Sequence, residues 1–152
     1  MSFTKHVADS LERLYNGEPW IGVTFKEHLI RIDADTAVKR FRDSNCIWQI
    51  VNHIIWWHQR VDRFLHNEAP EQDGDLPDFY LPDNTGPDNW HGALGRLEHS
   101  FATTAATIRH FPEAELFDTL PGTDNQAIYY LQGLIDHDAY HLGQIVLLHK
   151  YS

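Results

Sequence analysis

Apolar residues recur along this chain at intervals of three and four, which is the spacing of a helix that buries one face. The period of two that is typical of a half-buried strand does not extend over any long segment. The pattern predicts four long helices, at about residues 3–15, 46–66, 87–110 and 124–149. Helices of this length, joined by loops, favour an all-α protein with the architecture of a four-helix bundle.

Capping residues predict where the helices begin. Ser44 or Asn45 is expected to cap the second helix, and Pro87 suits the first turn of the third. Thr123 is followed three residues later by Gln126, which reads as a capping box for the fourth helix. We therefore expect a sharp start for each of these three helices.

The connections between the helices differ in character. Residues 20–42 carry many apolar side chains and are expected to form short capping helices between the first and second long helices. Residues 68–87 are rich in Pro, Asp, Gly and Asn and are expected to form a loop. No repeat or linker divides the chain, so we expect residues 1–152 to form a single domain.

Charge and composition narrow the possible partners. The net charge of −10 repels phosphate backbones and anionic lipid headgroups, which argues against nucleic acid and membrane surfaces as partners. No apolar run approaches the ~20 residues that span a bilayer. The first fifteen residues lack the pattern of a signal peptide, and a single cysteine excludes an internal disulfide. A cytoplasmic protein is the expectation.

Two of the eleven histidines, His137 and His141, are spaced to share a metal ion. Four residues along a helix place two side chains about 40° apart and ~6 Å along the axis, so that both ring nitrogens can reach one ion. In a chain this rich in histidine, such a pair can also arise by chance. Its position favours a metal, because it falls on the expected buried seam, which comprises Tyr130, Leu134, His137, His141, Gln144 and Leu148.

A third ligand is expected from the second helix, where His53 and His58 are the candidates. They lie on opposite flanks of the apolar face, so periodicity does not choose between them. Two other kinds of metal site are disfavoured. No Glu is followed three residues later by His, which excludes the di-iron bundle motif, and the His-Asp-x-x-His run at His137 is a poor match to the zincin motif.

Several stretches resemble one known family, the DinB/YfiT-like superfamily of four-helix-bundle metalloenzymes. They are Trp20-Ile21-Gly22, the run Ile-Trp-Gln-Ile-Val-Asn-His-Ile at 47–54, Trp57, Trp90, and the run Ile-Asp-His-Asp-Ala-Tyr-His-Leu-Gly-Gln-Ile at 135–145. The similarity extends through nearly the whole chain. It implies that one divalent metal ion is bound by His53, His137 and His141.

The resemblance implies less about the reaction. Some relatives are metal-dependent transferases that use thiols such as bacillithiol, mycothiol or glutathione, and others carry only a hydrolase or damage-inducible label. We expect an enzyme acting on a small molecule, either a thiol S-transferase or a hydrolase. The alternative is a non-catalytic, metal-stabilised binding or stress-response bundle. Three imidazoles suit zinc, nickel, iron or copper and do not identify the metal. No catalytic residue beyond the ligands is predicted.

Four further residues are candidates for the surroundings of the metal. Gln144 falls within about 20° of His137 on the helical wheel and is expected to orient a bound group. Trp57 and Trp20 are candidate apolar lining, and Asp138 is a candidate hydrogen-bond partner for a ligand histidine or a neighbouring helix. For Gln144, Trp57 and Trp20 the alternative interpretation is ordinary core packing.

Tryptophans on the second helix bear on the oligomeric state. Trp48 and Trp56 are expected to point away from the seam, so a loop, a cap or a partner chain must cover them. If a partner covers them, a two-fold homodimer is the commonest arrangement.

Overall fold

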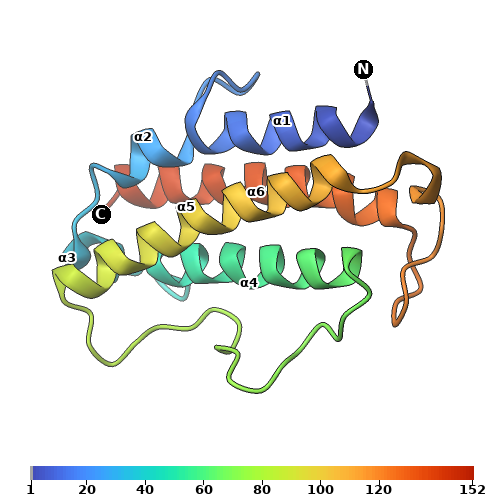
Figure 1. Cartoon of the computed structure of the whole chain (residues 1–152). Coiled ribbons are helices and arrows are strands. Elements are labelled where there is room, and N and C mark those ends of the chain that lie inside the picture. The colour runs from blue at the N-terminus through green and yellow to red at the C-terminus, as the bar shows by residue number, and fades with distance from the viewer. Residues whose placement is uncertain (1) are drawn as a thin grey trace.

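The computed structural model of the chain describes residues 2–152 and is built from helices (Figure 1). In chain order these are α1 (Phe3–Asn16), α2 (Phe25–Leu29), α3 (Ala34–Ala37), α4 (Ile47–Leu65), α5 (Pro87–His110), the 3₁₀ helix η1 (Glu113–Glu115) and α6 (Ala127–Lys150). Within the described residues there is no β-strand. The prediction of an all-α four-helix bundle is confirmed, with α1, α4, α5 and α6 as its long helices.

The four long helices pack so that α1 and α4 each contact both α5 and α6. In Figure 1, α4 and α5 run in one direction, while α1 and α6 run in the other. The connection between α4 and α5 must therefore return along the whole length of the bundle, and residues 66–86 do so beside α4 (Figure 1). None of the described helices is long and apolar enough to cross a membrane.

The short helices α2 and α3 close one end of the bundle, as the sequence predicts. α2 contacts α1 and α6, and α3 contacts α4 and α5. Each begins at a capping side chain: Thr24 Oγ1 accepts the Glu27 N–H at 3.2 Å, and Asp33 Oδ1 accepts the Thr36 N–H at 2.8 Å.

Two predicted caps of the long helices are wrong. Neither Ser44 nor Asn45 caps α4; the N-cap is Cys46, whose backbone N–H donates to the side chain of Gln49 at 3.2 Å. The capping box from Thr123 to α6 does not form either, because Thr123 closes a turn with Asn125.

The start of α6 has another source of acceptors. The N–H groups of Ala127 and Ile128 donate to the carbonyls of Asp118 and Leu116, at 3.0 and 2.9 Å. Backbone of the preceding loop thus provides the acceptors that a side-chain cap would otherwise supply.

The two tryptophans expected to point outward are covered within the chain. Trp48 is fully buried and packs on Trp90, with ring centroids 5.1 Å apart, and Trp90 Nε1 donates to the Ile32 carbonyl at 2.7 Å. Trp56 is half-buried under the guanidinium of Arg60, which lies 3.5 Å from the ring centroid. These side chains therefore do not require a partner chain.

The returning segment, residues 66–86, is held against α4 by polar side chains of that helix. Arg63 forms two contacts with the Asp75 carboxylate, at 2.5 and 2.7 Å, and also donates to the Pro70 carbonyl at 3.0 Å. Asn52 Nδ2 donates to the Tyr80 carbonyl at 2.7 Å. The segment lacks regular structure, but its path along α4 is fixed at both ends.

Candidate metal centre

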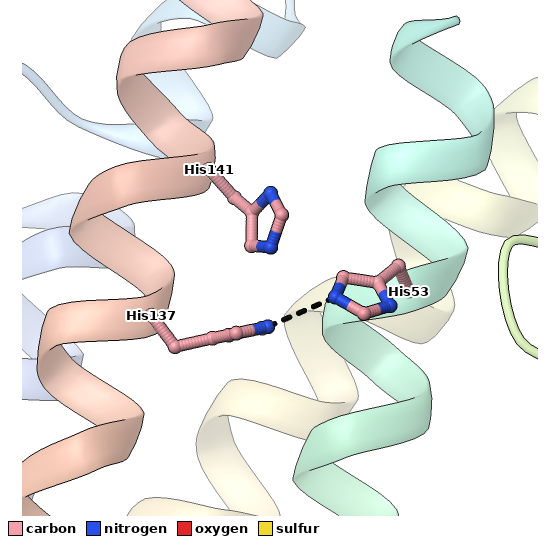
Figure 2. A group of neighbouring side chains, drawn as sticks. All are labelled: His53, His137 and His141. Carbon is pink, nitrogen blue, oxygen red and sulfur yellow. Dashed lines mark hydrogen bonds between the residues drawn. The ribbon is translucent and has the colours of Figure 1, made fainter. Parts of the chain in front are cut away.

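Three histidines from two helices meet between α4 and α6. His53 comes from α4 and His137 and His141 come from α6, and Figure 2 shows their rings pointing toward one another. One nitrogen from each ring lies within 4.8 Å of the other two, so the group can hold a metal ion. His53 Nε2 and His137 Nε2 are 3.1 Å apart (Figure 2). Two nitrogens bound to one tetrahedral zinc at ~2.0–2.1 Å would lie about 3.3–3.4 Å apart, close to this separation.

The nitrogen of each ring that faces away from the group is hydrogen-bonded to an oxygen. His53 Nδ1 lies 2.5 Å from Asp78 Oδ1, and His137 Nδ1 lies 3.0 Å from Asp138 Oδ1. His141 Nδ1 lies 2.7 Å from the side-chain oxygen of Gln144. Oxygen acceptors of this kind keep the proton on Nδ1 and leave Nε2 with a lone pair, which is how ligand histidines are held in metal sites.

With its protons placed in this way, the cluster of three histidines suits a cation. With both Nδ1 atoms donating to carboxylates, His53 Nε2 and His137 Nε2 direct lone pairs at each other across 3.1 Å, which is repulsive unless a positive charge lies between them. The carboxylates of Asp78 and Asp138 also bring negative charge to the outer side of the rings. A divalent cation satisfies all these groups at once, so the residues present fit the metal that the sequence implies.

Burial favours the neutral imidazole in two of the clustered histidines, His53 and His141. Burial, with a further effect of neighbouring His137, lowers the pKa of His141 to about 4. Burial also lowers the pKa of His53, against the opposing effect of the Asp78 carboxylate. Neutral imidazole is the form that binds metal, so the fold maintains the ligand form at pH values where free histidine is protonated.

Asp138 joins the metal centre to the bundle core. It is fully buried, and its second oxygen lies 2.8 Å from Nε2 of the equally buried His58. Burial alone would raise the pKa of Asp138, but the imidazoles of His58 and His137 hold it below its usual value. His58, the other candidate ligand on α4, thus faces Asp138 and is not one of the three clustered histidines.

Asp78 and Phe79 belong to the site although sequence patterns gave no signal for them. The Phe79 ring stacks on the His53 ring, with centroids 3.9 Å apart and planes 9° apart. Phe79 has a φ of 51°, an unfavourable conformation for a bulky residue. It is held there by its N–H, which donates to Asp78 Oδ1 at 2.8 Å, and by its carbonyl, which accepts from Gln49 at 3.1 Å.

The remaining predicted site residues separate into near and distant ones. Trp57 lies beside the site, with its ring 6.0 Å from that of His137. Gln144 contacts His141 and also donates to the Tyr140 hydroxyl at 2.9 Å, so it orients a ligand ring where the sequence suggested a bound group. Trp20 is fully exposed and is not brought to the histidines, because the turn closed between Pro19 and Gly22 leaves it outside the bundle.

Two hollows flank the histidines along the groove between α4 and α6. The first has a volume of about 210 Å³ and lies on the His137 side; it is lined by Trp57, Val61, Tyr129, Tyr130, Gly133, Leu134 and His137. The second has a volume of about 500 Å³ and lies on the His141 side; it is lined by Asp43, Ser44, Asn45, Ile50, Phe79, Tyr140, His141, Gln144, Leu147 and Leu148. The candidate metal centre therefore lies between two spaces that small molecules can enter.

Comparison with known proteins identifies the family. The profile of the DinB superfamily matches residues 24–145, which include all three clustered histidines, the whole of α4 and most of α6. The chain therefore belongs to the DinB superfamily. A search of curated proteins and a search of solved structures each found no match.

Removal of a clustered histidine is expected to remove the metal. Protein reconstituted with zinc should carry close to one ion per chain, and His53→Ala and His137→Ala should each lose most of it, since two imidazoles hold an ion far less tightly than three. His91→Ala, at an exposed position on α5, is the matched control and should keep it. Elemental analysis of the dialysed proteins measures the content. Loss in His58→Ala with retention in His53→Ala would contradict the assignment.

Asp138→Asn is expected to weaken metal binding by about 10–100-fold. An amide offers one acceptor oxygen where the carboxylate offers two, so either His58 or His137 loses its acceptor. Asp136→Asn, at an exposed site on the same helix, is the control and should bind normally. Competition against a chelator measures the affinity, and helical circular dichroism reports folding. Equal affinities in the two folded variants would refute this role of Asp138.

Metal affinity is expected to be level from about pH 8 to about pH 6 and to fall steeply below that. Protons and metal compete for the same nitrogens, and the lowered pKa values of His53 and His141 move this competition to lower pH than for free imidazole, whose pKa is about 6.5. Chelator competition at each pH measures the effect. Affinity that stays flat down to about pH 4, where His141 itself takes up a proton, would indicate ligands other than histidine.

Proposed function

We propose that this protein is a metal-dependent enzyme that acts on a small molecule, with His53, His137 and His141 as the ligands of one divalent ion. The observation that carries the proposal is the convergence of three ring nitrogens whose opposite nitrogens are each hydrogen-bonded to an oxygen. A site held this way is already in its ligand form before metal binds. The donor set suits zinc, nickel or iron.

The chain supplies three protein ligands, the number typical of catalytic rather than structural zinc sites. His53, His137 and His141 would hold a divalent ion that would lower the pKa of a bound thiol or water molecule, so that either could act as a nucleophile near neutral pH. Around it, Asp78, Asp138 and Gln144 fix the rings, and Phe79 covers one face of His53. These residues hold the ligands still while a small molecule is exchanged.

A thiol S-transferase is the favoured reaction class and a hydrolase the second. A transferase must bind a thiol and an electrophile together, and the two hollows on either side of the histidines provide space for two ligands. A hydrolase needs space for one substrate and water. In the transfer, sulfur bonds to the electrophilic carbon, the leaving group departs from that carbon, and the thiol proton goes to solvent.

A non-catalytic, metal-stabilised binding or stress-response bundle remains the alternative, since it would contain the same three ligands. A homodimer is likewise still a prediction. Its support is now the exposed apolar side chains of the segment between α1 and α4, Trp20, Ile30 and Phe41 among them, because Trp48 and Trp56 are covered within the chain.

Turnover by metal-loaded protein decides between the proposed functions. Zinc-, nickel- and iron-loaded proteins are each mixed with monochlorobimane and one thiol, which is bacillithiol, mycothiol or glutathione. Fluorescence follows the adduct that forms as chloride is displaced. We expect turnover with at least one thiol and none above the uncatalysed rate in His137→Ala. His91→Ala should match the unaltered protein.

Other outcomes have distinct meanings. Hydrolysis of 4-nitrophenyl acetate without any thiol, in the absence of bimane adduct, would replace the transferase by a hydrolase. Bound metal with neither reaction would support the binding bundle. A protein that retains no first-row metal would overturn the proposal as a whole.

A further inference from the structure

The hollow on the His137 side of the candidate metal centre is lined by aromatic and aliphatic residues beside His137, whereas the one on the His141 side combines apolar residues with a carboxylate, a hydroxyl and amides. Its walls include Trp57, Tyr129, Tyr130, Val61 and Leu134, and the rings of Tyr129 and Tyr130 lie 5.4 Å apart, edge to face. Beside His137, the residues that line this hollow include no Asp, Glu, Lys or Arg. The opposite hollow contains Asp43, Ser44, Asn45 and Gln144.

The size of the apolar hollow limits what it can hold. At about 210 Å³ it is smaller than the space needed for a whole drug-sized ligand, roughly 300 Å³ or more. An apolar cavity of about 150 Å³ holds one benzene molecule. The hollow therefore has room for one aromatic ring or an aliphatic group of similar size.

Its position places such a group next to the candidate metal. His137 belongs both to the lining and to the clustered histidines, and the Trp57 ring lies 6.0 Å from the His137 ring. If a ligand placed one apolar ring in the hollow, polar atoms attached to that ring would lie beside the clustered histidines.

We propose that this hollow, lined by Trp57, Tyr129, Tyr130 and Gly133, is a specificity subsite that binds one aromatic-ring-sized apolar group of the substrate. The proposal rests on the proposed function, because it assigns the ring to a molecule that reacts at the neighbouring metal. The substrate class is a small molecule with an apolar ring on one side of its reacting group. The larger hollow on the His141 side, whose lining adds carboxylate, hydroxyl and amide groups to apolar ones, is left for the second reactant.

Gly133 offers a way to fill the subsite without disturbing its walls. It lines the hollow, and a Cβ added there meets no heavy atom within 4 Å. Gly133→Leu therefore places a side chain at the hollow, and leucine favours a helix more than glycine does. Gly143 is the matched control: it is also an exposed α6 glycine with open space at its Cβ, but it does not line the hollow.

The test compares two metal-binding probes on zinc-loaded protein by calorimetry. Benzohydroxamate and acetohydroxamate share a group that chelates divalent metals and differ in carrying a phenyl ring or a methyl group. We expect benzohydroxamate to bind at least about tenfold more tightly to the unaltered protein and to Gly143→Leu, because the ring buries far more apolar area. In Gly133→Leu this preference should fall to about threefold or less, with acetohydroxamate binding unchanged. A full preference in Gly133→Leu would overturn the proposal.

A second measurement keeps this test independent of the metal. Metal-free protein is titrated into fluorobenzene, and the ¹⁹F line width reports binding. Broadening by the unaltered protein and by Gly143→Leu, but not by Gly133→Leu, supports the subsite even if zinc does not bind and the proposed function fails. Equal line widths with all three proteins would overturn the subsite, whatever the hydroxamates show.

Discussion

Hydrogen bonds to Nδ1, on the outer side of the three imidazoles, determine whether Nε2 on the inner side can bind a metal ion. A histidine presents a lone pair at Nε2 only while its proton stays on Nδ1, and here Asp78, Asp138 and Gln144 provide the oxygens that keep it there. The inner nitrogens then share a small space in which their lone pairs repel one another. The positive φ of Phe79 and the buried Asp138–His58 pair both occur at residues that contact this arrangement.

One of these oxygens belongs to Asp78, which reaches His53 because of the directions in which the helices run. Because α4 and α5 run in the same direction, the chain must return along α4, and Asp78 lies on that return (Figure 1). α4 fixes the path with side chains on both sides of His53: Gln49 and Asn52 hold the carbonyls next to Asp78, and Arg63 holds Asp75. A segment without regular structure can therefore place a carboxylate as firmly as a helix does.

A second oxygen comes from the core. Asp138 would be costly to bury as an isolated charge, but His58 and His137 each contribute a hydrogen bond to it. The same carboxylate thus links α4 to α6 and orients a clustered histidine. The candidate metal centre is consequently coupled to the packing of the bundle, and two hollows lie beside it along the groove between α4 and α6.

The long helices could be predicted from the sequence, because apolar spacing is a local property of each segment. The shared face of His137 and His141 could be predicted too, because four residues nearly complete a helical turn. Periodicity did not decide between His53 and His58, since both flank the apolar face of α4. The family resemblance indicated His53. The tertiary structure places His53 with His137 and His141, and His58 against Asp138. The predicted cap of α6 was wrong because backbone carbonyls of the preceding loop take the place of a side-chain cap.

Only the tertiary structure brought Asp78 to His53 and left Trp20 outside. Both depend on the paths of connecting segments, which are fixed by contacts between residues far apart in the chain, such as Arg63 with Asp75 and Asn52 with the Tyr80 carbonyl. Residues 68–87 contain several aspartates, and nothing in their local pattern distinguishes the one that meets a histidine. Periodicity describes a residue's place on its own helix, whereas the partners of a loop residue are set by the packing of the whole chain.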